Sequence, residues 1–181
     1  FGIGDRLLSP ATAKEIWDRA RERMAQPDFS CRQLMQQSKV KLICTTDDPL
    51  DSLEFHQLLA TDASFNIQVR PTWRPGKGMM LPNAQTFNAW VDGLAAVTGL
   101  TINSFDTYLE ALKLRHDYFH AAGCRLSDHS IESSFGEAVT PREMAQLFTQ
   151  IRQGAAATPR EADQFQAGML YEFAKLDAAR N

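Results

Sequence analysis

The chain has 181 residues, of which 44% are hydrophobic and 23% are charged, and its formal net charge is −3. This length and composition are typical of one globular domain with a real core, and no apolar run is long enough to cross a bilayer, so neither disorder nor a membrane span is indicated. Lysine and arginine are scattered among acidic residues without forming a basic stripe, so nucleic acid is not expected as a partner.

Helical patterns run through the chain and separate three short apolar segments. The capping residues and the 3/4 spacing of apolar side chains predict helices from Ser9 to about Ala25, from Ser30, from Leu53 to Asp62, from Phe87 to Gly99, from Ser104 to Gly123, and after Thr140 and Thr158. The apolar segments 39–45, 67–71 and 124–128 are predicted strands. Residues 72–82 and 129–139 are predicted loops.

Each predicted strand leads into a group of polar and charged residues, within 45–49, 70–75 and 127–129. Because helices separate the strands, the strands should run parallel and bring these polar groups to the same edge of a sheet. The expected fold is α/β, with three parallel βα units and extra helices at both ends. We expect a helical lead-in over residues 1–38 and the βα units over 39–181. Three strands alone leave two bare edges, so the chain is either an incomplete (β/α)8 TIM-type barrel or a small open sheet.

The polar residues at the first two strand ends allow both functional and structural roles. Asp47 and Asp48 are adjacent carboxylates of the kind used in acid/base chemistry, although Asp-Asp-Pro is also a common turn; the turn is favoured for Asp48 and Asp47 is left open. Arg70 and Arg74 offer forked donors for a carboxylate or phosphate, and Trp73 could form a pocket wall. Alternatively, one arginine forms a structural ion pair with Asp47 or Asp48, and Arg70 is favoured for that role.

Histidine and cysteine give one open hypothesis and several structural ones. His129 follows Asp128 at the third strand end, where a neutral imidazole could bind a metal or simply cap the next turn. His116 and His120 lie four residues apart on one helix, as in the zinc motif His-Glu-x-x-His, but aspartate replaces the glutamate and the helix should lie outside the sheet. A structural role is therefore expected for both.

Cys31, Cys44 and Cys124 are far apart in the sequence and match neither a disulfide framework nor a zinc site. Cys44 and Cys124 are expected in the core, and the reducing cytoplasm is the expected location. The chain opens on Phe1 without signal-peptide features, which fits a piece of a longer protein.

Three ordered motifs resemble one known family. Residues 45–56 (TTDDPLDSLEFH), 71–77 (PTWRPGK) and 123–132 (GCRLSDHSIE) resemble the middle of the uronate (glucuronate) isomerases. The resemblance covers essentially the whole chain but only about two fifths of that family's length. It implies a distorted (β/α)8 barrel of the amidohydrolase superfamily with a divalent metal, usually zinc. It also implies a ketose/aldose isomerisation of hexuronates by proton transfer between C1 and C2 through an enediol.

The resemblance also implies roles for single residues. His129 matches a histidine in or beside the metal site, and Arg74 matches an arginine suited to the uronate carboxylate. Asp47 and Asp128 match rim positions that can supply acid/base groups, and Trp73 matches a rim position beside the substrate.

Two residues depart from the family pattern: Gly76 replaces an aspartate and Ser130 replaces a glycine. The family's other metal-site motifs lie outside these 181 residues, so the chain alone is not expected to be active. A metal-dependent hydrolase of the same superfamily is the first alternative function, and a non-catalytic module that binds a partner through exposed strand edges is the second. A homo-oligomer is compatible with the sequence.

Overall fold

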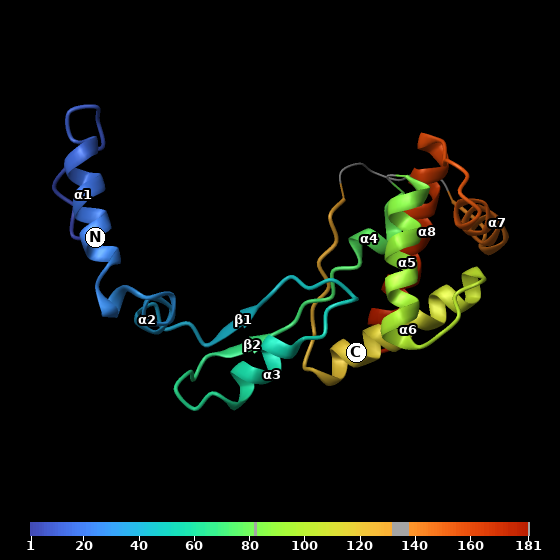
Figure 1. The fold of residues 1–181 in the computed structure, drawn as a ribbon, viewed down its shortest axis with the longest axis horizontal. Helices are drawn as coiled ribbons and strands as arrows, with labels where there is room; N and C mark the ends of the chain where they lie inside the picture. The colour runs from blue at the N-terminus through green and yellow to red at the C-terminus, as the bar shows by residue number, and fades with distance from the viewer. Residues whose placement is uncertain (82, 132–137, 181) are drawn as a thin grey trace.

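The computed structural model describes residues 1–81, 83–131 and 138–180, in which helices lie at both ends of a small parallel sheet (Figure 1). In chain order the elements are α1 (Ala13–Met24), the 3₁₀ turn η1 (Pro27–Phe29), α2 (Cys31–Gln37), β1 (Leu42–Cys44), α3 (Glu54–Thr61), β2 (Gln68–Arg70), α4 (Gly76–Met79), α5 (Ala84–Thr98), α6 (Phe105–Ala121), α7 (Pro141–Arg152) and α8 (Pro159–Ala178). The predicted α/β class is confirmed. Part of the predicted loop 129–139, residues 132–137, lies outside the described residues.

Three chain segments run parallel at the centre of the molecule. β1 pairs with β2, with Leu42 opposite Gln68 and Cys44 opposite Arg70. Beyond β2, Trp73 forms parallel bridges to Asp47 on one side and to Ser127 on the other. The predicted third strand, 124–128, therefore joins the sheet only through the bridge at Ser127, so its prediction as a regular strand is wrong. We call residues 124–129 the third segment.

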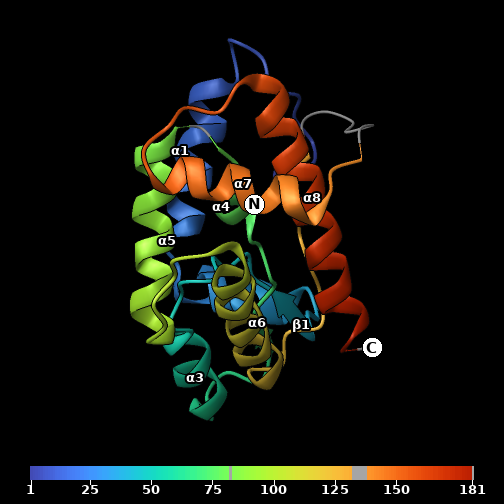
Figure 2. The same ribbon diagram turned by 90° about the vertical axis from the view of Figure 1, so that its right-hand side faces the viewer.

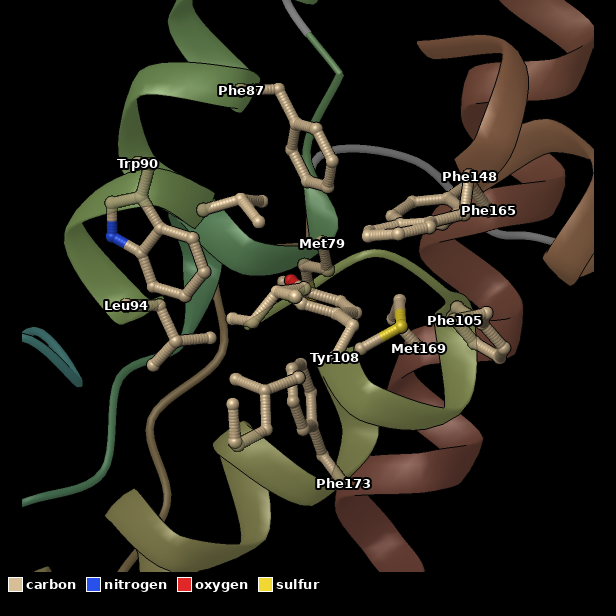
Figure 3. Packing of buried hydrophobic residues seen from close by; sticks show 14 of the residues in the cluster. Met79, Phe87, Trp90, Leu94, Phe105, Tyr108, Phe148, Phe165, Met169 and Phe173 are labelled. Carbon is tan, nitrogen blue, oxygen red and sulfur yellow. The ribbon is translucent and has the colours of Figure 1, made fainter. Parts of the chain in front are cut away.

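Helices α5, α6, α7 and α8 pack against one another and enclose the main core. Tyr108 of α6 lies in its middle, stacked on Phe148 with ring centroids 5.0 Å apart and edge-on to Phe87 (Figure 3). The Tyr108 hydroxyl donates a hydrogen bond to the carbonyl of Gly78 in α4. Burial and this bond hold α4 in place, which explains a helical turn inside the predicted loop 72–82.

The start of α1 and its surroundings differ from the prediction. The helix begins at Ala13 with Thr12 as N-cap, later than the predicted cap at Ser9. None of its residues is buried, and Trp17 of its apolar stripe is 64% exposed. Figure 1 shows α1 at the opposite end of the molecule from α5–α8, and in Figure 2, which looks along that direction, α1 lies behind these helices. An amphipathic stripe becomes buried only where another element covers it, and no described element covers this one.

Local signals elsewhere place the elements correctly. Thr140 and Thr158 each accept a hydrogen bond from the backbone of a glutamate three residues later, which completes the predicted capping boxes. Gly99 ends α5 in the left-handed conformation, with φ of 70°.

Cys124 is buried as predicted, whereas Cys44 is exposed because β1 has a neighbour on one side only among the described residues. No helix in the described ranges has the length and hydropathy needed to cross a bilayer.

Candidate active site at the strand ends

The ends of the three parallel segments bring the predicted site residues into one region but onto two faces. Asp47, Trp73 and Ser127 occupy one row of bridges across the segments. Successive side chains of an extended chain point to opposite faces, so Arg74 and Asp128 lie on the face opposite Trp73. Trp73 and Ser127 face α6 and α8, because Trp73 packs on Phe119 and Ser127 bonds to Asp177.

Arg74 and Asp128 meet on the face turned away from α6 and α8. Arg74 Nη1 lies 3.5 Å from Asp128 Oδ2, and Nη2 donates to Ser130 Oγ at 2.6 Å. Both charged side chains are accessible, with 41% and 47% of their surface exposed. A forked cation beside a carboxylate can bind an anionic substrate and exchange a proton with it. Ser130 is thus a partner of the arginine that sequence analysis did not identify.

Asp47 is 8% exposed and its carboxylate is already engaged. Oδ2 accepts hydrogen bonds from Thr45 Oγ1 at 2.6 Å and from the Thr72 backbone N–H at 3.1 Å. Thr45 Oγ1 also lies 2.7 Å from His56 Nε2. Since the hydroxyl has one proton, which it gives to Asp47, the histidine is the donor in that contact. Asp47 therefore ties the ends of β1 and β2 together, which favours a positioning role; its catalytic role stays a prediction.

Trp73 is fully buried, with ring-centroid distances of 5.3 Å to His116, 5.2 Å to Phe119 and 6.4 Å to Phe173. Its indole Nε1 is buried without a hydrogen-bond partner in the described part of the chain. This placement makes Trp73 a support between the sheet and the helices, and contact with substrate stays a prediction.

His129 stacks on Phe173 of α8, with ring centroids 5.7 Å apart and planes 7° apart. Burial lowers the pKa of His129, and the carboxylates of Asp177 and Asp128 oppose this shift only in part. Its Nδ1 is buried without a hydrogen-bond partner among the described residues. A neutral imidazole with an unpaired nitrogen fits a metal ligand. However, within residues 1–81, 83–131 and 138–180 no three histidine, cysteine, aspartate or glutamate side chains lie close enough to hold a metal ion.

The structural alternatives are confirmed for Asp48 but not for the arginines. Asp48 Oδ1 accepts the Leu50 N–H at 2.9 Å, as expected for the turn, and Oδ2 lies 3.2 Å from Lys77 Nζ. The prediction that an arginine forms an ion pair with Asp47 or Asp48 is wrong: no such pair is present among the described residues. Arg70 instead lies against Gly123, where a Cβ would meet its side chain.

His116 has a structural setting, as predicted from its place on the helix. Its Nε2 lies 3.0 Å from Asp177 Oδ1, and its ring contacts the edge of Trp73. Asp177, near the end of α8, also accepts Ser127 Oγ at 2.8 Å and 2.7 Å on its two oxygens. Sequence analysis did not identify Asp177 as a site residue. The sequence feature that could have indicated it is its spacing of four residues from Phe173, which places both side chains on one face of the helix.

Comparison with known proteins matches the whole chain to one family model, described as glucuronate isomerase, over residues 1–181. The chain is 45% identical to the uronate isomerase of Cellvibrio japonicus over 99% of this chain and 38% of that protein. It is also 45% identical to the uronate isomerase of Bacteroides thetaiotaomicron, over 98% of this chain and 37% of that protein. The crystal structure of uronate isomerase from Thermotoga maritima superposes with a TM-score of 0.84 and 28% identity, covering 98% of this chain and 39% of that one. The chain therefore spans less than two fifths of the length of the curated relatives it matches.

Proposed function

Because this chain belongs to the glucuronate isomerase family, we propose that it is the central segment of a uronate isomerase. The parent protein would interconvert D-glucuronate with D-fructuronate and D-galacturonate with D-tagaturonate. In this aldose–ketose reaction a base removes the C2 proton of the open-chain aldose, an enediol forms, and a proton is delivered to C1. The observation that supports the proposal best is the meeting of Arg74 and Asp128, delivered by two parallel segments to one exposed cluster.

The roles we propose follow from charge and access. Arg74 presents guanidinium N–H groups to the uronate carboxylate, and Ser130 holds the other edge of the fork. Asp128 is an exposed carboxylate beside that binding group and would transfer the proton as acid or base. Asp47 would keep the strand ends in register from within the structure.

We further propose that the three parallel segments are neighbouring strands of a (β/α)8 barrel closed by the rest of the parent chain. Among the described residues, β1 and the third segment each have one edge without a neighbouring strand, and this supports the proposal because an exposed strand edge leaves backbone groups unpaired. Residues 1–38 as a helical lead-in and a homo-oligomeric parent stay predictions.

A divalent metal, zinc by resemblance, is proposed for the parent protein. His129 is a candidate ligand, because its buried Nδ1 has no hydrogen-bond partner in the described part of the chain and the residue stands at the end of the third segment. The described residues do not complete a ligand set, so the other ligands would come from the remainder of the parent. When bound, the metal would supply a Lewis acid.

The test is to incubate the full-length parent with D-glucuronate in D2O and follow the sugars by NMR. The proposal predicts D-fructuronate, and deuterium at C2 of the recovered D-glucuronate, because the enediol is protonated again from solvent. Asp128→Asn should slow both signals, while Asp163→Asn, the same substitution at an exposed position of α8, should not. Hydrolysis of an amide or ester without isomerisation would support the hydrolase alternative and refute the proposal.

A further inference from the structure

Helix α8 holds the third segment at two alternate residues. Phe173 stacks on His129, and four residues later Asp177 accepts two contacts from Ser127 Oγ, at 2.8 Å and 2.7 Å. Both contacts lie on the helix-covered face of the sheet. Asp128, between Ser127 and His129, points to the opposite face and meets Arg74 there.

The spacing of these contacts follows from the geometry of a helix and an extended chain. Residues four apart on a helix are separated by about 6 Å along its axis, and residues two apart on a strand by about 6.6 Å. Phe173 and Asp177 therefore match His129 and Ser127 one to one. A shift of the third segment by one residue would break both contacts and turn Asp128 toward the helices.

Side-chain contacts matter here because the backbone holds the third segment weakly. Among the described residues, two backbone hydrogen bonds join it to the neighbouring segment: Trp73 N–H to Leu126 O at 3.0 Å, and Asp128 N–H to Trp73 O at 2.9 Å. β1 and β2, by contrast, pair over three residues. The orientation of the Asp128 side chain toward Arg74 thus depends on the side-chain contacts of its neighbours, Ser127 and His129.

Asp177 is itself held in position by His116, whose Nε2 lies 3.0 Å from Oδ1. Burial acts to raise the pKa of Asp177, but the hydrogen bonds from His116 and Ser127 bring the pKa below its ordinary value. The side chain is therefore an ionised acceptor at neutral pH. His116 in turn packs against Trp73, so the chain of contacts returns to the bridge row of the sheet.

We propose that Asp177 is a positioning residue of the active site: by holding Ser127, it fixes the third segment so that Asp128 faces Arg74. This inference rests on the proposed isomerase function for its kinetic consequence. The contacts themselves do not depend on that function.

The test uses the full-length parent with D-glucuronate. Asp177→Ala should lower kcat about tenfold or more, because a small displacement of a catalytic group is costly, and should change KM much less, because Arg74 is untouched. Asp177→Asn keeps an acceptor oxygen for Ser127 and should recover part of kcat. Ser127→Ala should also lower kcat, because it breaks the same Ser127–Asp177 contact. The double variant should be no slower than Asp177→Ala alone, which removes that contact and the carboxylate beside His116.

The matched control is Asp163→Ala, at an exposed position of the same helix, which should keep the kcat of the unmodified protein. If Asp177→Ala lowers the melting temperature but leaves kcat within about twofold, the residue is only structural and the inference is wrong.

If the unmodified parent does not isomerise D-glucuronate, the proposed function fails, and amide hydrogen exchange then decides the inference separately. Exchange over residues 124–129 should be faster in Asp177→Ala than in the unmodified protein. Unchanged exchange over that segment would overturn the positioning role.

Discussion

Removing the guanidinium of Arg74 should weaken the binding of the uronate carboxylate in the full-length parent. Nη2 already donates to Ser130 and Nη1 is 3.5 Å from Asp128, too far for a strong hydrogen bond, so Nη1 is available to a substrate. A hydrogen bond to a charged group contributes about 1.5–3 kcal/mol, and each 1.4 kcal/mol corresponds to about tenfold in affinity. Arg74→Ala should therefore lower kcat/KM for D-glucuronate about 10- to 150-fold. The lower end is expected because the side chain is 41% exposed and solvent screens its charge.

Steady-state kinetics of Arg74→Ala, Arg74→Lys and a control measure this effect. Lysine keeps the charge but not the fork, so Arg74→Lys should fall between the alanine variant and the unmodified protein. Arg142→Ala, at an exposed position of α7, should leave kcat/KM unchanged. If Arg74→Ala keeps kcat/KM within about twofold while the protein stays folded, Arg74 does not bind the carboxylate.

Three further predictions concern stability, each measured by unfolding of the full-length parent. Tyr108→Phe leaves a buried carbonyl without its donor and should cost about 1–3 kcal/mol, whereas Tyr171→Phe, at an exposed tyrosine, should cost almost nothing. Gly123→Ala should lower the free energy of unfolding more than Gly154→Ala. Both glycines have positive φ, 94° and 93°, but only at Gly123 would the added Cβ meet a neighbouring guanidinium. Equal losses of unfolding free energy in the two variants would exclude this steric contribution. Burial lowers the pKa of His129, so as the pH falls this histidine is protonated in the unfolded state before it is protonated in the folded state. The free energy of unfolding should therefore fall as the pH drops below about 6.5. His129→Gln should show a smaller fall over the same pH range, and an equal fall would contradict this assignment.

Local chemistry made most of the helices predictable. Thr140 and Thr158 with their glutamates, Ser104 with its capping box, and Gly99 with positive φ all depend on contacts within a few residues, which sequence displays directly. The direction of the three segments was also predictable, because helices separate them and parallel crossovers require such helices.

Tertiary contacts decided what sequence could not. The turn α4 forms because Tyr108, thirty residues away in sequence, bonds to Gly78. The third segment meets its neighbour only in the bridge from Ser127 to Trp73, whereas β1, which also has a described neighbour on one side only, forms a three-residue ladder with β2. The sequence patterns of the two segments did not distinguish these outcomes. Asp47 and Trp73 were placed at the rim as functional candidates, but an alternating chain has two faces, and only packing shows that Trp73 lies under α6 and α8.

A double-mutant cycle on Arg74 and Asp128 tests whether the two segment ends act as one site. kcat/KM for D-glucuronate would be measured in the full-length parent for Arg74→Ala, Asp128→Ala and the double variant. Groups in contact couple by about 0.5–3 kcal/mol, so the double variant should lose at least about twofold less than the product of the two single losses. A double loss equal to that product would mean that Arg74 and Asp128 act independently, and it would contradict a shared uronate site at these strand ends.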